Sequence, residues 1–374
     1  MNSASQADKN MAPDSGIPFD RLKKICLPDE KKVCLLGFAF GVRENAFHKF
    51  SEAGMADMGA VSTSLRWGAK CAAGGQVQFV TDSTSLCVHV TLAVKPDMVN
   101  MSPIAQCGTD CYLLDEVSGK FVFYSVSKFP PDRSEYTCSL FSGLPRKKRT
   151  VLLNLPLYAE VKNFVIGIDT DACILPFTRF RENGRFVFYG TSILQGGCAS
   201  RPGAMYTNIL SRSLEKECLN FGFSGNAFGE EIVARRLAEV ENPGGYILDY
   251  ETNALDKGTL ESSLPEFIGI LRRAHPETPI LVVSGTKQSL DFWDSDFCGR
   301  RERAKQFEKN LVNRLRRKGD RNVWFLDFGE LFGPSYPEYT VDGIHPSDEG
   351  FRRMADRAEK KLRHIQNRKE RVRS

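Results

Sequence analysis

The sequence predicts an α/β fold in its second half, a doubly wound five-stranded parallel sheet, preceded by an all-β domain of jelly-roll type. After residue 184, short apolar runs alternate with segments of helical period, which is typical of a parallel sheet whose strands are joined by helices. Before residue 178, short apolar runs are separated by turn residues and no helical period is sustained. The chain of 374 residues, 41% hydrophobic and 26% charged, is long enough for two globular domains.

The N-terminal part begins with 17 small and polar residues, including Pro and Gly, which predict a disordered lead-in over 1–17. Short strand-like runs follow within 18–178, at 33–36, 77–80, 87–92, 121–124, 149–155 and 164–168. Turn residues divide these runs at short spacing, as they do in antiparallel sheets. We therefore expect a β-sandwich, most simply a jelly roll, over 18–178.

The second domain is expected over 184–367, after the polar stretch 179–184, and a basic tail over 368–374. Its expected strands lie at 186–189, 218–223, 246–249, 279–283 and 323–327. Its expected helices lie near 203–217, 229–240, 259–274, 300–318 and 348–366. Because parallel crossovers need a helix and are right-handed, these helices are expected on both faces of the sheet.

Ser192 is the first candidate for a reactive residue. The apolar run 186–189 ends at Gly190, which permits a sharp turn, and Ser192 therefore lies at the edge where open α/β sheets bind ligands. Far downstream, Asp342 and His345 are three residues apart, so one segment can deliver an imidazole and the acid that orients it. Taken alone, Ser192 is more simply a hairpin or cap serine, and Asp342 a turn aspartate.

Four blocks in order, 190–192, 220–226, 248–253 and 342–345, resemble the SGNH (GDSL) esterase and lipase superfamily over about 185–365. Two departures are visible. Thr191 stands where the family name has Asp, and Tyr250-Glu-Thr precedes Asn253 where Gly-x is usual. In the first domain, 108–112 (Gly-Thr-Asp-Cys-Tyr) resembles the Gly-x-Asp-Leu-Tyr motif of β domains that precede some SGNH esterases.

The resemblance implies a flavodoxin-like fold and a serine esterase. Ser192 would be the nucleophile, His345 the general base and Asp342 the group that orients it. The oxyanion would be held by the backbone N–H of Ser192, the backbone N–H of Gly225 and the side-chain amide of Asn253. Read without the family, Gly225 belongs to an ordinary turn and Asn253 is a helix cap.

Further residues are candidates for contact with the substrate. Cys198 and Arg201 lie in the loop that follows the nucleophile and is expected to line the pocket, with Cys198 closing it and Arg201 binding an acidic group of the substrate. The alternative is a helix-entry loop in which neither residue has such a role. Glu251, unusual for the family, either tunes the site electrostatically or points into solvent. In the first domain, Asp110 and Tyr112 are candidate sugar contacts, with packing as the alternative role.

The esterase interpretation implies no metal or organic cofactor. Cys107 and Cys111 could form a disulfide or bind a metal, but no second pair of ligands accompanies them, so no zinc site is expected. The net charge of +5 comes partly from basic runs at 146–149 and 352–373 without interleaved aromatic residues, so these runs are expected to be solvated surface and not to bind nucleic acid. No apolar run approaches the ~20 residues of a membrane span, and no membrane partner is expected.

The compartment expected from the chain as given is the cytoplasm. Eleven scattered cysteines without a CxxC pair favour a reducing environment, and the N-terminal residues lack the apolar centre of a secretion signal. The expected activity is hydrolysis of a short-chain acyl ester, most simply an O-acetyl ester of a carbohydrate, because similar proteins tend to be carbohydrate esterases. An acyltransferase using the same site, or a carbohydrate-binding protein with a vestigial esterase half, are the alternatives. The sequence does not indicate whether the protein is a monomer or an oligomer.

Overall fold

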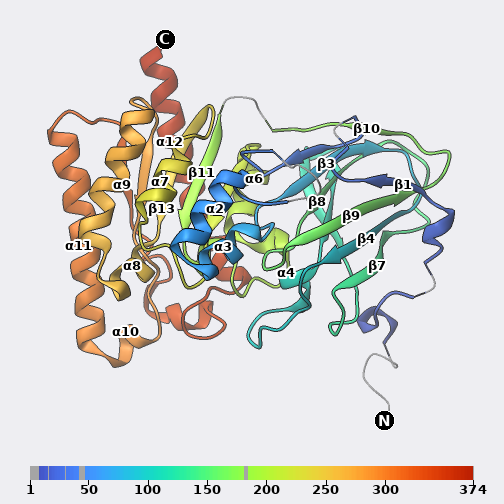
Figure 1. Ribbon diagram of the computed structural model, residues 1–374, viewed down its shortest axis with the longest axis horizontal. Coiled ribbons are helices and arrows are strands. Elements are labelled where there is room, and N and C mark those ends of the chain that lie inside the picture. Colours follow the sequence, from blue (N-terminus) through green and yellow to red (C-terminus); the bar gives the residue numbers. More distant parts are fainter. Residues whose placement is uncertain (1–7, 16, 30, 42–46, 181–183, 374) are drawn as a thin grey trace. The chain divides into compact units, whose positions relative to one another are not determined.

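The computed structural model (Figure 1) describes residues 8–15, 17–29, 31–41, 47–180 and 184–373. By contacts the chain divides into two compact units that interleave along the sequence. Unit 1 comprises Met1–His48, Lys70–Arg179 and Ser200–Gly203, and unit 2 comprises Lys49–Ala69, Phe180–Ala199 and Ala204–Ser374. The domains expected from the sequence are continuous ranges, whereas each of these units is assembled from separate stretches.

Unit 1 contains two antiparallel sheets. The first has the strand order β1-β9-β4-β7, and the second has the order β10-β3-β8-β5-β6 with β2 paired to β3. The strands are β1 Lys23–Cys26, β2 Cys34–Leu36, β3 Gln76–Thr81, β4 Leu86–Leu92, β5 Asp110–Asp115, β6 Lys120–Val126, β7 Glu135–Phe141, β8 Arg149–Asn154, β9 Val161–Ile168 and β10 Ile174–Pro176. This two-sheet arrangement is compatible with the jelly roll that the sequence predicts.

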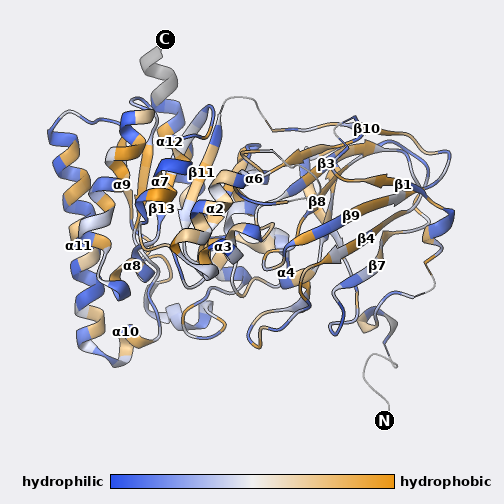
Figure 2. Ribbon diagram, in the orientation of Figure 1, coloured by the Kyte–Doolittle hydropathy of each residue, from blue (hydrophilic) through white to orange (hydrophobic). Residues whose placement is uncertain are grey.

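Alternation along the strands of unit 1 builds a single core between its sheets. Val88 and Val90 of β4 and Val151 and Leu153 of β8 belong to one cluster of buried side chains drawn from both sheets. In Figure 2 these strands are coloured largely hydrophobic. The burial of both inner faces explains why the strand-like runs were visible in the sequence as apolar stretches.

Helices also occur where the sequence predicted none before residue 178: α2 Glu52–Val61, α3 Thr63–Lys70 and α4 Pro103–Cys107. The expectation of an all-β stretch is wrong for these residues. In α2 the many Ala, Gly and Met residues blur the helical period, and only Gly54, Met55 and Met58 are buried. Most of α2 and α3 belongs to unit 2, so unit 1 itself remains predominantly β.

The expected lead-in and tail can be compared with the structure in part. Residues 8–15 are described, and Asp14 accepts a hydrogen bond from Ser139 N (2.9 Å) in β7 while its own N–H donates to Lys128 O (2.9 Å). Residues 1–7 and 16 lie outside the described residues. The expected basic tail continues the helix α12 Asp348–Arg373.

Unit 2 confirms the predicted five-stranded parallel sheet, with the order β12-β11-β13-β14-β15. The strands are β11 Arg185–Gly190, β12 Cys218–Gly222, β13 Pro243–Asp249, β14 Ile280–Val283 and β15 Val323–Leu326. The helices are α5 Ser192–Gln195, α6 Tyr206–Leu214, α7 Glu231–Leu237, α8 Glu251–Lys257, α9 Leu260–Ala274, α10 Leu290–Trp293, α11 Ser295–Arg317 and α12.

The sheet of unit 2 is covered on both faces. Successive strand residues point to opposite faces, and on β11 Phe188 packs edge-on against Tyr206 of α6 while Tyr189 stacks on Phe267 of α9. Helix α12 lies on the same face as α6, since Phe351 stacks on Tyr206. In Figure 1, α9 and α11 lie side by side beyond β13, away from α6. Helices on both faces leave the carboxyl ends of the strands as the place where such a sheet can build a site.

Candidate active site

Three neighbouring strands of unit 2 end level with one another. Gly190, at the end of β11, pairs with Gly222 of β12 on one side and with Asp249 of β13 on the other. Ser192, Gly225 and Asn253 follow these ends by two, three and four residues. The parallel register thus brings three residues from three separate sequence blocks to one edge of the sheet, where such folds place their sites.

Two glycines let the helix that carries Ser192 pack tightly on these strand ends. A Cβ on Gly190 would lie 3.0 Å from Leu194 Cβ of this helix, and a Cβ on Gly222 would lie 2.3 Å from the Gln195 backbone nitrogen. Helix α5 begins at Ser192, and the Thr191 hydroxyl caps it by accepting from Ile193 N (3.3 Å). Thr191, the departure from the family name, therefore serves as a helix cap.

Ser192, His345 and Asp342 form a continuous hydrogen-bonded chain. The Ser192 Oγ lies 2.8 Å from His345 Nε2, and His345 Nδ1 lies 2.8 Å from Asp342 Oδ2. The other oxygen of Asp342 accepts from the backbone N–H of His345 (2.8 Å) and Ile344 (3.1 Å). If Nδ1 donates its hydrogen to the carboxylate, Nε2 is left as the acceptor that can take a proton from the serine hydroxyl.

The electrostatics of the carboxylate favour its charged form. Partial burial by itself would raise the pKa of Asp342, but the hydrogen bonds from the backbone and ring of His345, together with the charge of that ring, outweigh it and lower the pKa to about 2. Cys198 lies beside this carboxylate, with Sγ 3.9 Å from Asp342 Oδ2. Burial, and then the Asp342 charge, raise the pKa of the Cys198 thiol to about 12.

The loop 223–226 lies on the β12 side of Ser192. Gly225 has a φ of +65°, which suits glycine, and a Cβ there would meet no atom within 4 Å, so space is open above its backbone. The loop is fixed by Gln195 of α5, whose Oε1 accepts from Ser224 N (2.9 Å), and by Asn253, whose Nδ2 donates to Asn226 O (2.5 Å). An amide nitrogen carries two hydrogens, so Asn253 retains a second donor.

Sequence reasoning missed Lys49, which the structure places beneath this loop in unit 2. Its side chain is buried, and Nζ donates to the carbonyl oxygens of Asn220 (2.8 Å) and Gly222 (3.0 Å). Ser64 of α3 also reaches the loop and donates to Asn226 Oδ1 (3.1 Å). Nothing in the local pattern around residue 49 signals this role, because the contact spans more than 170 residues of sequence.

Lys49→Met is expected to destabilise unit 2. Two buried carbonyls at the end of β12 would lose their donor, at a cost of about 1–3 kcal/mol each, and the loop that carries Gly225 would loosen. Urea unfolding followed by tryptophan fluorescence measures the change, since all three tryptophans, Trp67, Trp293 and Trp324, lie in unit 2. The exposed Lys309→Met in α11 is the control, and equal stability of the two variants would contradict the role of Lys49.

Glu251 is buried within unit 2. Its carboxylate accepts from Gly285 N (2.9 Å) and lies 3.8 Å from the Arg301 guanidinium, so it does not point into solvent. Burial raises the pKa of Glu251, which Arg301 partly offsets, and burial followed by the charge of Glu251 raises the pKa of the neighbouring Glu308. Because Glu251 begins the helix α8 that carries Asn253, these contacts fix the start of that helix.

Because Asp249 is buried, we expect the free energy of unfolding to depend on pH. Burial, and then the charge of Glu251, raise its pKa to about 7 against a hydrogen bond from Tyr206 (2.6 Å). Between about pH 4 and 7 the folded state then holds a proton that the unfolded state has released, so stability falls as pH rises. Asp249→Asn is expected to remove this slope. The free energy of unfolding of the variant minus that of wild type, measured with urea, should therefore rise by about 2–4 kcal/mol from pH 4.5 to pH 7.5. Parallel pH profiles for the two proteins would refute the assignment.

Arg201 is engaged within unit 1. Its guanidinium lies 3.1 Å from Asp110 Oδ2, contacts the Tyr112 hydroxyl and stacks 4.0 Å from the Phe123 ring centroid. Asp110 is fully buried and also accepts from Gly203 N (2.7 Å). The motif 108–112 therefore holds the loop 200–203, and its polar groups serve that internal contact, which favours the packing role over the sugar-binding one.

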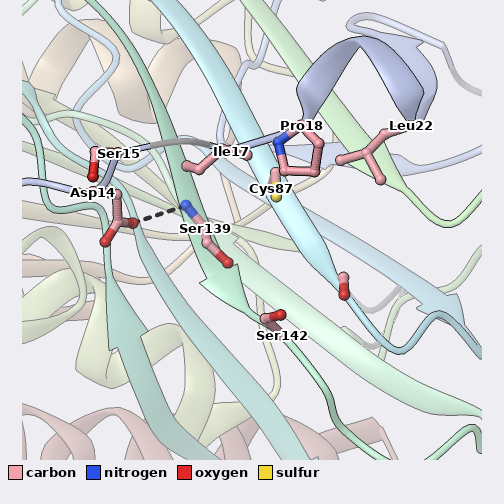
Figure 3. A pocket seen from close by; sticks show the side chains of 9 residues that line it. Asp14, Ser15, Ile17, Pro18, Leu22, Cys87, Ser139 and Ser142 are labelled. Atoms are coloured by element: carbon pink, nitrogen blue, oxygen red, sulfur yellow. Dashed lines mark hydrogen bonds between the residues drawn. The ribbon is translucent and has the colours of Figure 1, made fainter.

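A hollow of about 290 Å³ lies in unit 1, lined by serines and apolar side chains (Figure 3). Asp14, at its rim, accepts a hydrogen bond from the Ser139 backbone. The lining residues are Asp14, Ser15, Ile17, Pro18, Leu22, Ser85, Cys87, Ser139 and Ser142. None of the residues expected to do chemistry lines it.

Comparison with known proteins adds the family. Residues 183–363 match the GDSL-like lipase/acylhydrolase family, and residues 28–174 match the N-terminus of SGNH-hydrolase-type esterases. Residues 183–363 belong to the GDSL-like lipase/acylhydrolase family. The protein is accordingly an ester hydrolase by class. A comparison with curated proteins finds no match.

Solved structures resemble this GDSL-family protein over most of its length. A protein described as a GDSL-like lipase from Bacteroides ovatus is 29% identical, with a TM-score of 0.83, covering 92% of this chain and 98% of that one. A salicylyl-acyltransferase from a tetracycline biosynthetic pathway is 18% identical (TM-score 0.68; 92% and 98%). A family two carbohydrate esterase from Clostridium thermocellum, in complex with cellohexaose, is 15% identical (0.58; 79% and 93%). The last two likenesses establish a shared fold.

None of the helices in the described part of this GDSL-family chain combines the length and apolar character needed to cross a bilayer.

Proposed function

We propose that this protein is a serine esterase that hydrolyses short-chain acyl esters, in particular O-acetyl esters of carbohydrates. The observation that carries the proposal is the hydrogen-bonded chain from Ser192 Oγ through His345 to Asp342, with both links at 2.8 Å. This arrangement supplies a nucleophile, a base within reach of its proton, and an acid that orients the base. Two of the four family blocks, 190–192 and 342–345, supply this hydrogen-bonded chain.

The residues have defined roles in the proposed reaction. His345 Nε2 takes the Ser192 proton as Oγ attacks the acyl carbon, and the imidazolium then protonates the leaving alcohol. The oxyanion that forms is received by the N–H groups of Ser192 and Gly225 and by the amide of Asn253. Each such donor contributes about 2.7–4 kcal/mol to the transition state. Water activated by His345 then hydrolyses the acyl-enzyme.

The choice of substrate rests on analogy. Structures that share this fold over most of the chain include family two carbohydrate esterases, one of them with bound cellohexaose. Fold likeness alone does not carry function, because sites vary on a common scaffold. We assign acetyl or another short chain as the acyl half of the ester and a sugar as its alcohol half, so that each half can be tested separately.

The test is a panel of p-nitrophenyl acetate, butyrate and octanoate, followed by release of acetate from acetylated cello-oligosaccharides and acetylated glycerol. We expect the acetate ester to be hydrolysed fastest and the acetylated sugar to be preferred over acetylated glycerol. A preference for octanoate would refute the short-chain assignment. Equal rates on the sugar and on glycerol would refute the carbohydrate assignment.

An acyltransferase is the second candidate, supported by the salicylyl-acyltransferase among the structures of similar fold. The acyl-enzyme is common to both reactions, and only the acceptor differs. Product analysis with and without added alcohols and sugars separates them. Hydrolysis that is unaffected by acceptors supports the esterase, whereas new esters formed at the expense of free acid would reassign the protein as a transferase.

A further inference from the structure

Three side chains of the kinds that bind transition metals converge in unit 2. Cys198, Asp342 and His345 each offer one ligand atom, and these atoms all lie within 4.8 Å of one another. The Asp342 Oδ2 is central, 2.8 Å from His345 Nδ1 and 3.9 Å from Cys198 Sγ. The proposed hydrolysis uses the imidazole and the carboxylate but gives the thiol no role.

The separations are close to those of a zinc site. With Zn–S near 2.3 Å and Zn–N and Zn–O near 2.0–2.2 Å, neighbouring ligand atoms of a tetrahedral ion lie about 3.3–3.6 Å apart. To reach these values, the carboxylate oxygen and ring nitrogen, now 2.8 Å apart, would separate by ~0.5–0.8 Å. The sulfur would approach the carboxylate oxygen by ~0.3–0.6 Å and the ring nitrogen by at most ~1.5 Å. One thiolate, one imidazole and one carboxylate leave a fourth position for water.

The donor set also discriminates among cations. Thiolate and imidazole ligands suit zinc and other thiophilic ions, whereas Mg²⁺ and Ca²⁺ prefer sites built entirely from oxygen. The Cys198 side chain is buried, so its sulfur faces the Asp342–His345 pair and not bulk solvent. The site therefore has the ligand types that a thiophilic cation requires, with a buried thiol, a partly buried imidazole and an exposed carboxylate.

We propose that Cys198, Asp342 and His345 form an inhibitory binding site for Zn²⁺ and related thiophilic divalent cations. Binding converts the Cys198 thiol to a thiolate, whose proton passes to solvent, while the carboxylate and a neutral imidazole keep their charge states. An ion on Nδ1 leaves the ring hydrogen on Nε2, which then donates and cannot take the Ser192 proton. An ion on Nε2 blocks that nitrogen directly. In either geometry the base is lost.

The inhibition arm of this proposal rests on the proposed esterase function, but the binding arm does not. Binding is measured as the ultraviolet charge-transfer absorption of a cadmium–thiolate bond on titration with Cd²⁺. All eleven cysteines are free thiols, so the informative quantity is the difference between proteins. We expect a band in wild type that Cys198→Ala loses and that Cys298→Ala, the control in α11, retains.

Each protein is first assayed on p-nitrophenyl acetate with EDTA, which gives its metal-free reference rate. Inhibition is then measured without EDTA, as the Zn²⁺ concentration that halves this reference rate. We expect Cys198→Ala to need at least about tenfold more Zn²⁺ than wild type or Cys298→Ala, since even loss of outer-shell partners weakens metal sites 10–100-fold. Excess EDTA should restore activity, and Mg²⁺ should not inhibit.

Ser192→Ala separates the two proposals. This variant should keep the Cys198-dependent cadmium band, which supports the metal site even if wild type proves to have no esterase activity. Equal cadmium spectra for wild type and Cys198→Ala would overturn the site, and so would equal Zn²⁺ sensitivity of the two proteins.

Discussion

Ser192→Ala is expected to lower kcat for p-nitrophenyl acetate by about 10⁴- to 10⁶-fold, the range set by loss of a nucleophile that acts as a unit with its base. The physical reason is the position of Oγ, 2.8 Å from His345 Nε2 at the end of β11, where no other hydroxyl replaces it in the hydrogen-bonded chain of the described residues. Initial rates over a range of substrate concentrations give kcat and KM separately.

Ser262→Ala in α9 is the matched control, because its exposed hydroxyl bonds only to the nearby Thr259 carbonyl among the described contacts. It should retain the wild-type rate. Tryptophan fluorescence on urea unfolding should show that unit 2 is folded in both variants. Substantial activity remaining in Ser192→Ala would place the nucleophile elsewhere and remove the basis of the proposed mechanism.

Asp342→Asn is expected to lower kcat by about 10⁴-fold while changing KM little, since a wrong tautomer disables the base without altering substrate contacts. The carboxylate accepts from His345 Nδ1 and from two backbone N–H groups. An amide in its place presents one oxygen, and its nitrogen, if turned toward the ring, would make Nδ1 an acceptor and place the hydrogen on Nε2. Nε2 would then be unable to take the serine proton.

The control for this substitution is Asp356→Asn, on the exposed surface of α12. Steady-state kinetics of both variants on p-nitrophenyl acetate, with unfolding curves, distinguish loss of function from loss of fold. A decrease of less than about tenfold would show that the imidazole does not depend on Asp342 for its orientation, far below the effect expected of an orienting acid.

The alternation of apolar runs with helical periods was sufficient to predict the parallel sheet. Each strand is buried on both faces and therefore appears in the sequence as a short continuous apolar run. The expected strand at 218–223 became Cys218–Gly222, and the expected helix at 259–274 became Leu260–Ala274. The short blocks around Ser192 and Asp342–His345 were also visible, because each is a contiguous motif at a turn. The structure brings these two blocks into hydrogen-bond contact.

The tertiary structure alone decided what surrounds those motifs. Lys49 joins unit 2 and holds the end of β12, Arg201 is taken up by Asp110 in unit 1, and Glu251 is buried against Arg301. Each of these contacts links residues 50 to 171 positions apart in the chain. A period of two or 3.6 residues reports which face of an element is buried, but not which distant side chain will meet it. The partners of buried polar groups are therefore determined only by the packing inside each unit.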